Sequence, residues 1–196
     1  MEQTKLLFSL LRSAMTGEAS GVEKGSISLS RAQVLLGVTR TLDIASFVAL
    51  AMEREELLAP DAAPLARAFK EQQFLALYRY ERTQYAQEQI CALLAAGQID
   101  FLPLKGAVLR DLYDKPWLRT SCDIDILVHE EDLERAAQAL VKELSYTTDN
   151  KKKYHDMWLF SPSGIHLELH FSILETMDNI DRLLSRVWEY ATPVTQ

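Results

Sequence analysis

The sequence is poor in cysteine and glycine. It has two cysteines, Cys91 and Cys122, and seven glycines among its 196 residues. Two cysteines without metal-type spacing exclude a disulfide-stapled scaffold, and the low glycine content excludes a collagen-like chain. We therefore expect a protein of the reducing cytoplasm whose stability comes from a buried hydrophobic core.

The sequence also lacks a long hydrophobic run. No segment reaches the roughly 18 uninterrupted apolar residues that a membrane-spanning helix needs. The short apolar stretch near the N-terminus follows Glu2 and has no basic region before it. We interpret this stretch as a helix of the mature protein and not as a signal peptide, and we predict no association with a membrane.

Positive charge is in the minority, with 21 Lys and Arg against 28 Asp and Glu and a net charge of −7. An acidic protein has little attraction for a phosphate backbone, so nucleic-acid binding is not favoured, although a local basic patch could still bind a nucleotide or a tRNA. Hydrophobic residues make up 48% of the chain and charged residues 25%. This composition excludes intrinsic disorder and indicates one globular domain or two small ones.

The hydrophobic pattern divides the chain into two regions. Residues 1–97 have helical spacing, and the stretch after Pro64 runs to Ala96 without glycine or proline. It is expected to form one helix of roughly 33 residues that ends at Gly97. From residue 98 strand-like and helix-like segments alternate. We predict an α+β fold in which a helical N-terminal region (1–97) precedes a catalytic core with a small mixed sheet and flanking helices (98–196).

The expected elements of the second region follow the order β-α-β-α-β-β-β. Strands are predicted at residues 99–104, 122–128, 146–149, 154–160 and 165–171, and helices at 106–113, 130–144 and 179–190. The last two strands are expected to form a hairpin. In the first region, Ser28 and Ser30 are predicted to cap a short helix that ends at Leu36.

Two acidic residues lie inside a predicted strand, where aspartate is unfavourable. Asp123 and Asp125 are separated by one isoleucine and followed by further large apolar residues. Residues two apart in a strand point to the same face, so the two aspartates have Cα atoms roughly 7 Å apart on one face. Adjacent carboxylates repel unless a cation lies between them, and oxygen ligands suit Mg²⁺ or Mn²⁺. The alternative is a solvent-facing strand that carries two aspartates.

A later predicted strand offers a third carboxylate. Within residues 165–171, Glu168 shares a face with His166 and His170, and the large apolar residues take the other face. If this strand lies beside the first, three carboxylates meet and can hold two divalent ions, as in nucleotidyl transfer. The alternative for Glu168 is an exposed hairpin charge. His166 is expected to be a partly buried polar residue, whereas His170 is an open candidate for the site.

A strand-to-helix turn at residues 104–107 adds a third feature. Gly106 permits close approach of a ligand, and Lys105 adds a positive charge, so the turn suits a triphosphate. The alternative is a simple β-α connection. Arg119 and Ser121, just before the acidic strand, are candidates for phosphate contacts or for ordering the loop. Arg110 is expected on a helix surface.

Taken together, LKGA at 104–107, R-x-x-x-DIDILV at 119–128 and ELH at 168–170 resemble the nucleotidyltransferase superfamily with its DNA polymerase beta-like fold. The closer resemblance is to a bacterial group of uncharacterised nucleotidyltransferases, and it spans residues 99–190. The resemblance implies metal ligands at Asp123, Asp125 and Glu168, with Mg²⁺ or Mn²⁺ and a nucleoside triphosphate, expected to be ATP. It also implies phosphate contacts near Lys105 and Gly106.

The activity that the resemblance implies is transfer of a nucleoside monophosphate to a hydroxyl acceptor with release of pyrophosphate. The acceptor is expected to be a small molecule, a protein or an RNA end. The superfamily's usual Gly-Gly or Gly-Ser turn is replaced here, so a serine contact to phosphate is missing, and Ser121 is a candidate substitute.

Members of the group have more chain after the core, so a fragment or a short form is expected. The alternative function is a catalytically silent nucleotide-binding or regulatory module, toxin–antitoxin-like, whose helical region binds a protein partner.

Overall fold

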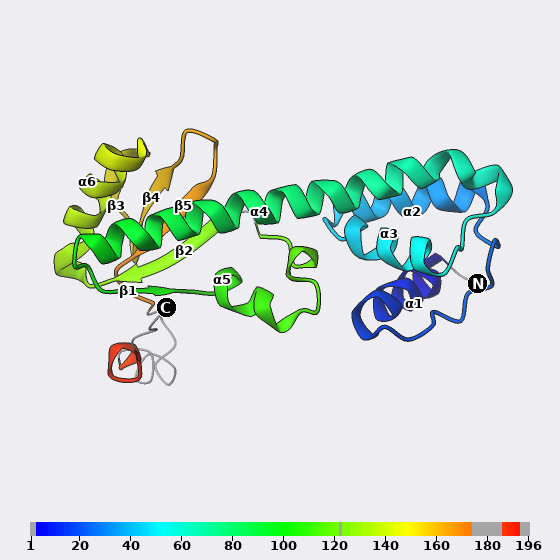
Figure 1. Cartoon of the computed structure of the whole chain (residues 1–196), viewed down its shortest axis with the longest axis horizontal. Coiled ribbons are helices and arrows are strands. Elements are labelled where there is room, and N and C mark those ends of the chain that lie inside the picture. The colour runs from blue at the N-terminus through cyan, green and yellow to red at the C-terminus, as the bar shows by residue number, and fades with distance from the viewer. Residues whose placement is uncertain (1–2, 122, 174–185, 193–196) are drawn as a thin grey trace. The chain divides into compact units, whose positions relative to one another are not determined.

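A computed structural model describes residues 3–121, 123–173 and 186–192 (Figure 1). The chain forms two compact units, one from residues 1–82 and 112–120 and one from residues 83–111 and 121–196. The helix α4 (Ala66–Ala96) contributes residues to both units. Within the described residues, no helix combines the length and the apolar character that crossing a membrane requires.

The first unit is built from helices. Its elements are α1 (Gln3–Thr16), α2 (Leu29–Thr41), α3 (Ala45–Arg54), the 3₁₀ helix η1 (Pro60–Leu65), the first part of α4 and the 3₁₀ helix η3 (Pro116–Leu118). Apolar residues at helical spacing face inward from each long helix. The fully buried members of this core include Leu6, Leu10, Leu35, Val48 and Leu57. The predicted helical character of this part of the chain is therefore confirmed.

The helix α2 is longer than predicted and is capped differently. It was expected to end at Leu36 but runs through Gly37 to Thr41. One interior glycine costs a helix only about 1 kcal/mol, which packing of a buried helix face outweighs. Ser28 occupies the N-cap position, but its side chain makes no capping hydrogen bond. Asp61 instead accepts a hydrogen bond of 3.2 Å from the first N–H of the helix.

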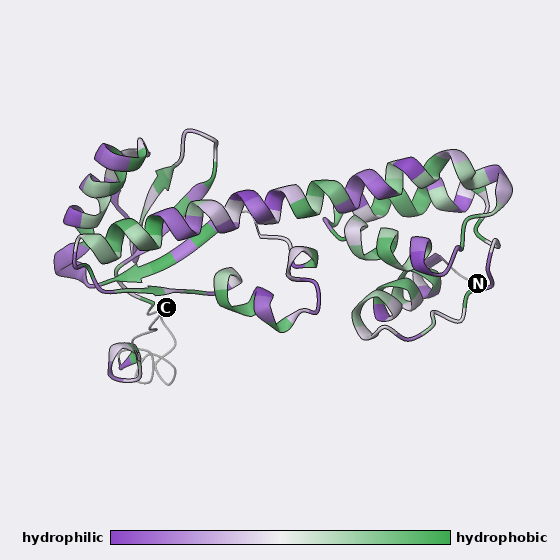
Figure 2. Ribbon diagram, in the orientation of Figure 1, coloured by the Kyte–Doolittle hydropathy of each residue, from purple (hydrophilic) through white to green (hydrophobic). Residues whose placement is uncertain are grey.

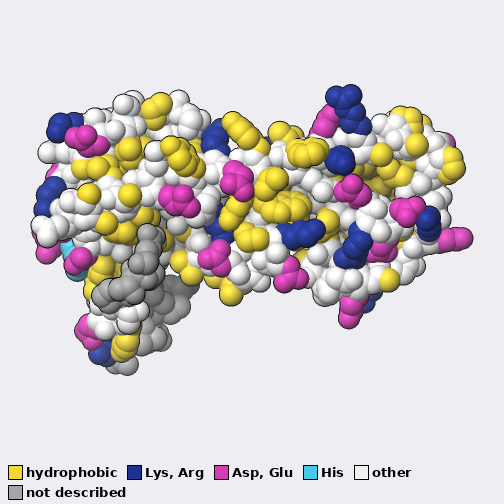
Figure 3. Space-filling view, viewed as in Figure 1, with side chains coloured by type: hydrophobic (Ala, Val, Ile, Leu, Met, Phe, Trp, Pro, Cys, Tyr) yellow, Lys and Arg dark blue, Asp and Glu magenta, His cyan; other side chains and the backbone are white. Residues whose placement is uncertain are grey.

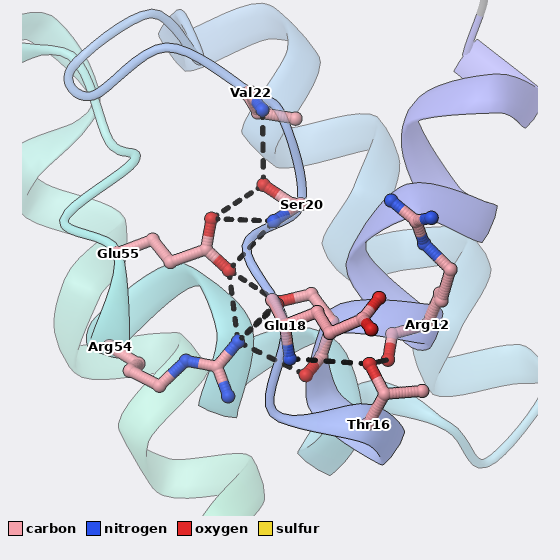
Figure 4. Close-up of polar contacts among 8 residues, drawn as sticks. Arg12, Thr16, Glu18, Ser20, Val22, Arg54 and Glu55 are labelled. Carbon is pink, nitrogen blue, oxygen red and sulfur yellow. Dashed lines mark hydrogen bonds and ion pairs between the residues drawn. The ribbon is translucent and has the colours of Figure 1, made fainter.

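One carboxylate ties the loop after α1 to the end of α3 (Figure 4). Glu55 accepts hydrogen bonds from the N–H of Ser20 at 3.0 Å and from its hydroxyl at 2.6 Å. It also accepts from the hydroxyl of Ser13 and from Arg54. Burial raises the pKa of Glu55, but these hydrogen bonds outweigh burial and lower the pKa to about 2. The carboxylate is therefore ionised and anchors the loop over a wide pH range.

The second unit contains a five-stranded sheet with the order β1-β2-β5-β4-β3. The strands are β1 (Phe101–Pro103), β2 (Asp123–Val128), β3 (Thr147–Lys152), β4 (Asp156–Phe160) and β5 (His166–His170). The pair β2–β5 is parallel, and the other neighbouring pairs are antiparallel. The last two strands form the predicted hairpin. A mixed sheet with flanking helices, preceded by helical chain, confirms the predicted α+β class.

Helices cover one face of this sheet. The C-terminal part of α4 and the helix α6 (Leu133–Leu144) pack against the apolar side chains of the central strands, and both helices alternate between polar and apolar residues in Figure 2. The buried core contains Ile90, Leu94, Ile124, Ile126, Leu133, Leu140, Met157, Leu159, Leu167 and Leu169. Because side chains alternate along a strand, the intervening polar and aromatic residues of β2, β5 and β4 share the opposite face.

Several predicted boundaries differ from those of the structure. The strand expected at 146–149 extends to Lys152 through a register shift. The helix expected at 106–113 is α5 (Gly106–Leu109) followed by a 3₁₀ turn. The helix α4 ends at Ala96, directly before Gly97 as predicted, and the left-handed residue that follows is Gln98 (φ 52°).

Two predictions reach chain that the structure does not describe. The helix predicted at 179–190 lies mostly outside the described residues, of which 187–189 form a 3₁₀ turn. Cys122, the first residue of a predicted strand, also lies outside them.

On the face that Figure 3 shows, acidic and basic side chains are interspersed. That face carries mixed charge, in keeping with the modest net charge of the chain.

Candidate active site

The parallel pairing of β2 and β5 brings two acidic residues side by side. Asp125 pairs in register with Glu168, and Asp123 pairs with His166 two residues earlier on the strands. Register partners on adjacent strands point to the same face of the sheet. The sequence predicted a common site for these carboxylates only on the condition that the two strands are neighbours, and the structure shows that they are.

Asp125 is the most buried carboxylate of the group, with 3% of its side chain exposed. Its Oδ1 lies 2.9 Å from Nζ of Lys105 and 2.9 Å from Nε2 of His170. Burial raises the pKa of Asp125, but the hydrogen bonds from His170 and Lys105 and their charges outweigh it, so the pKa is lowered. The group is therefore a buried, ionised carboxylate held by two donors on one oxygen.

Glu168 has the opposite pKa shift. Its pKa is raised because the side chain is largely buried and because the negative charge of Asp125 is close. Oε2 of Glu168 lies 3.4 Å from Nε2 of His170, so both carboxylates face the same imidazole nitrogen. Neighbouring carboxylates with divergent pKa values are typical of catalytic sites and of sites that receive a cation.

The turn before α5 has an unusual backbone that directs Lys105 into this group. Lys105 has φ 45° and ψ −111°, backbone angles that residues other than glycine rarely adopt. Burial lowers the pKa of the Lys105 ammonium, but its hydrogen bond and ion pair with Asp125 raise it by more. A Cβ at Gly106 would lie 2.9 Å from Oγ of Ser121. The turn therefore requires glycine at this position because of the close approach of Ser121.

Ser121 connects the turn to the first acidic residue of β2. Its hydroxyl lies 3.0 Å from the backbone oxygen of Asp123 and 3.3 Å from Oδ1 of the same residue. The hydroxyl donates to Asp123 at the start of β2 and so fixes the position of that residue. Arg119 belongs to the first unit, where its backbone N–H donates to the oxygen of Pro116 at 3.2 Å.

The side chains present fit a divalent cation. One atom each of Asp125, Glu168 and His170 lies within 4.8 Å of the others; the two carboxylates supply oxygen ligands, and Nε2 of His170 holds Asp125. Carboxylate oxygens dominate the face that these residues share with Asp123, and oxygen-rich sets favour Mg²⁺ or Mn²⁺. A positive ammonium and an imidazole N–H already approach Asp125, which shows that the site attracts positive charge.

The sequence profile of a family of uncharacterised nucleotidyltransferases matches residues 30–196. The chain belongs to this family. A search of curated proteins found no match. The match includes all five strands of the sheet and the acidic pair on β2 and β5. It confirms the predicted family and a nucleotidyltransferase assignment at the level of the family.

The structure shows that the prediction for Arg110 is wrong. It was expected on a helix surface, but it is 4% exposed. Its Nε donates to the oxygen of Gly106 at 3.1 Å, and its terminal nitrogens lie 3.4 Å from the amide oxygens of Gln84 and Gln87. Arginine is tolerated inside because carbonyl and amide oxygens accept its donors. Two glutamines on one helix face were the only sequence signal for it.

His166 is partly buried, as predicted, and forms part of an aromatic group. Its ring stacks on Phe160 with centroids 4.7 Å apart and meets Trp158 edge-on at 5.0 Å. Its Nδ1 lies 4.0 Å from Oε1 of Glu168. This face of the sheet therefore changes from carboxylates on β2 and β5 to aromatic rings on β4.

Proposed function

We propose that the protein transfers a nucleoside monophosphate from a nucleoside triphosphate to a hydroxyl acceptor, with release of pyrophosphate. The observation that carries this proposal is the contact group of Asp125, Glu168 and Lys105 on adjacent parallel strands and the turn beside them. This arrangement combines oxygen ligands for divalent ions with a cation for phosphate, within a family of nucleotidyltransferases.

Asp123, Asp125 and Glu168 are the residues that would hold divalent ions. Such ions, when bound, neutralise the triphosphate and promote attack by the acceptor hydroxyl. Asp125 and Glu168 supply oxygens from register partners, and Asp123 supplies oxygens from the next position on the same face. The protein's own contribution is to hold these oxygens in fixed positions before the substrate arrives, which lowers the reorganisation that the reaction requires.

Lys105 is the residue that would bind the phosphates. Its side chain is 61% exposed, although its ammonium contacts Asp125. The ammonium can therefore turn from the carboxylate toward a triphosphate without leaving a buried position. We assign Lys105 to neutralising the β- and γ-phosphates, with Gly106 allowing their close approach.

His170 and Ser121 are positioning residues in this proposal. Nε2 of His170 lies 2.9 Å from Asp125, and the hydroxyl of Ser121 lies 3.3 Å from the carboxylate of Asp123. Each fixes one of the two aspartates. ATP is the expected nucleotide, and the acceptor is the hydroxyl of a small molecule, a protein or an RNA end.

Calorimetric titration of the full chain with ATP, GTP, CTP and UTP in Mg²⁺ tests this function. Glu168→Gln and Asp123→Asn keep the shape of each side chain and remove its charge. The matched control is Glu143→Gln on α6, whose carboxylate lies at the surface beside Lys142. We expect Mg²⁺-dependent binding of one nucleotide in wild type and control, and a loss of at least tenfold in each site variant.

The nucleotide identified in this way is then incubated with candidate acceptors, and pyrophosphate release is measured. Binding without any Mg²⁺ dependence, or binding that survives both site variants, would contradict the proposed site. Mg²⁺-dependent binding without pyrophosphate release for any acceptor class would support the silent nucleotide-binding module instead.

A further inference from the structure

Beside the carboxylate site, at the β4 edge of the same face of the sheet, three side chains have buried polar atoms without a hydrogen-bond partner. His155 precedes β4, Asp156 begins it and His170 ends β5. Within the described chain, Nδ1 of both histidines and Oδ1 of Asp156 are buried and make no hydrogen bond. Unpaired polar atoms are rare in protein interiors because leaving them unpaired costs free energy. Three such atoms on contacting residues indicate a ligand.

The three residues are held together by strand pairing and ring stacking. Asp156 and His170 are direct partners on the antiparallel strands β4 and β5. The rings of His155 and His170 stack with centroids 5.4 Å apart and an angle of 5°. The oxygen of His155 accepts a hydrogen bond of 3.0 Å from the N–H of Phe171. Each of the three residues offers one ligand atom, and these atoms lie within 4.8 Å of one another.

The contact with Asp125 determines which nitrogen of His170 is available as a ligand. A carboxylate oxygen accepts hydrogen bonds, so the hydrogen between Oδ1 of Asp125 and Nε2 of His170, which lie 2.9 Å apart, is assigned to Nε2. In the neutral ring Nδ1 then has a free lone pair. Histidines that bind metals usually donate their second ring N–H to a carboxylate, as His170 does here.

Asp156 is a buried carboxylate that accepts few hydrogen bonds. It is 5% exposed, and its Oδ2 accepts a hydrogen bond of 3.2 Å from the indole N–H of Trp158. Nε2 of His155 lies 3.6 Å from the same oxygen. A buried carboxylate requires a counter-charge, and a bound cation would supply it at the unpaired oxygen.

We propose that His155, Asp156 and His170 form a second metal site, which binds a borderline transition ion such as Zn²⁺ and not Mg²⁺. Two imidazole nitrogens and one carboxylate oxygen are the ligand set that such ions prefer, whereas the oxygen-rich set around Asp125 and Glu168 prefers Mg²⁺. Around a tetrahedral ion the ligand atoms would approach to about 3.4 Å, so small side-chain rotations complete the site.

The proposed ion would stiffen the active site from the side of β4. It would join the start of β4 to the end of β5 and fix the ring of His170, whose other nitrogen holds Asp125. His155 is 32% exposed whereas Asp156 and His170 are nearly closed off, so the ion would enter from the side of His155. The site is separate from the nucleotidyl transfer proposed above and does not depend on it.

Titration with Co²⁺ and Zn²⁺ tests this site. The full chain is freed of metal with a chelator and kept in a large excess of Mg²⁺, so that the oxygen-rich site is occupied. Co²⁺ is followed by its visible absorption and Zn²⁺ by competition with a coloured chelator. We expect one tightly bound equivalent in wild type, and a loss of affinity of at least about tenfold in His155→Ala and in Asp156→Asn.

Asp156→Asn keeps the shape of the side chain and an oxygen for Trp158, so it preserves the fold if His155→Ala does not, and far-UV circular dichroism verifies this. Glu168→Gln is the matched control because it weakens only the oxygen-rich site and should retain the Zn²⁺ equivalent. Absence of tight Co²⁺ or Zn²⁺ binding by wild type would overturn the proposal. So would loss of the equivalent in Glu168→Gln together with its retention in His155→Ala, because the ion would then lie between Asp125 and Glu168.

Discussion

Nζ of Lys105 lies 2.9 Å from Oδ1 of Asp125, the same oxygen that Nε2 of His170 approaches at 2.9 Å. A buried carboxylate without such partners would carry an uncompensated charge in a medium of low dielectric constant. Lys105 therefore supplies the positive charge that Asp125 needs when no divalent ion is bound. We assign the same ammonium to binding the triphosphate. When metal and nucleotide bind, Asp125 would therefore exchange Lys105 for a divalent ion, and Lys105 would exchange Asp125 for a phosphate.

Replacing Lys105 by methionine should reveal this exchange. In a chelator, Lys105→Met should lower the free energy of unfolding by about 1 kcal/mol, because Asp125 loses a hydrogen bond from a charged but mostly exposed group. Mg²⁺ should reduce this difference, since the ion replaces the lost charge. Urea unfolding with and without Mg²⁺ measures both effects. Lys151→Met, at an exposed position of β3, is the control, and an equal deficit with and without Mg²⁺ would contradict the exchange.

Gly106→Ala should be destabilising because of one contact. The new Cβ would lie 2.9 Å from Oγ of Ser121, so that hydroxyl must move away from Asp123. We expect a loss of about 1–2 kcal/mol, as for other overpacked sites. In a Ser121→Gly background the clash disappears, and the loss should shrink to a few tenths of a kcal/mol. Urea unfolding of the four proteins measures the coupling, and equal losses in the two backgrounds would exclude the steric explanation.

The alternation of polar and apolar residues along the predicted strands indicated the site better than any single polar residue did. Alternation in β2 and β5 predicted correctly which side chains share a face, because strand periodicity is set by the backbone alone. The sequence did not predict that the two strands pair, or that the pair is parallel, because local pattern does not determine which strands are neighbours. Glu168 could therefore be placed beside Asp125 only conditionally.

Residues whose role depends on distant partners were not predictable. Arg110 has the local context of a surface residue, and only the packing of α5 near Gln84 and Gln87 buries it. His155 and Asp156 fall within the strand predicted at 154–160, and their contact with His170 depends on the register of the β4–β5 hairpin. Register is fixed by the whole sheet and not by any segment of it.

Substitution of Arg110 should loosen the phosphate turn. Its Nε donates to the oxygen of Gly106, so Arg110→Met leaves that oxygen and the amides of Gln84 and Gln87 with fewer donors. We expect a loss of about 1–3 kcal/mol in the free energy of unfolding. Arg110→Lys should restore little of it, because an ammonium cannot reproduce the planar guanidinium geometry. Arg67→Met, an exposed arginine of α4 in the first unit, serves as the control, and full recovery with lysine would show that charge alone matters.

Glu55 should make the stability of the first unit depend on pH in the acid range. Its folded pKa of about 2 lies below its ordinary value of 4.5. A carboxylate with a lowered pKa stabilises the folded state fully above its unfolded pKa, and this contribution is lost as the pH falls from about 4.5 toward 2. Glu55→Gln removes the charge, so the variant should be about 1–3 kcal/mol less stable at pH 7, with a difference from wild type that narrows through this window.

The neighbouring Glu56 provides a matched control for this prediction. Its carboxylate is 69% exposed and pairs with Lys24 at 2.8 Å. An exposed ion pair contributes between about 0 and 1 kcal/mol, so Glu56→Gln should change stability little at any pH. Thermal unfolding of the three proteins between pH 7 and pH 2 distinguishes the two positions. If Glu55→Gln and wild type keep a constant difference down to pH 2, the hydrogen bonds to Ser13 and Ser20 do not depend on the charge of Glu55.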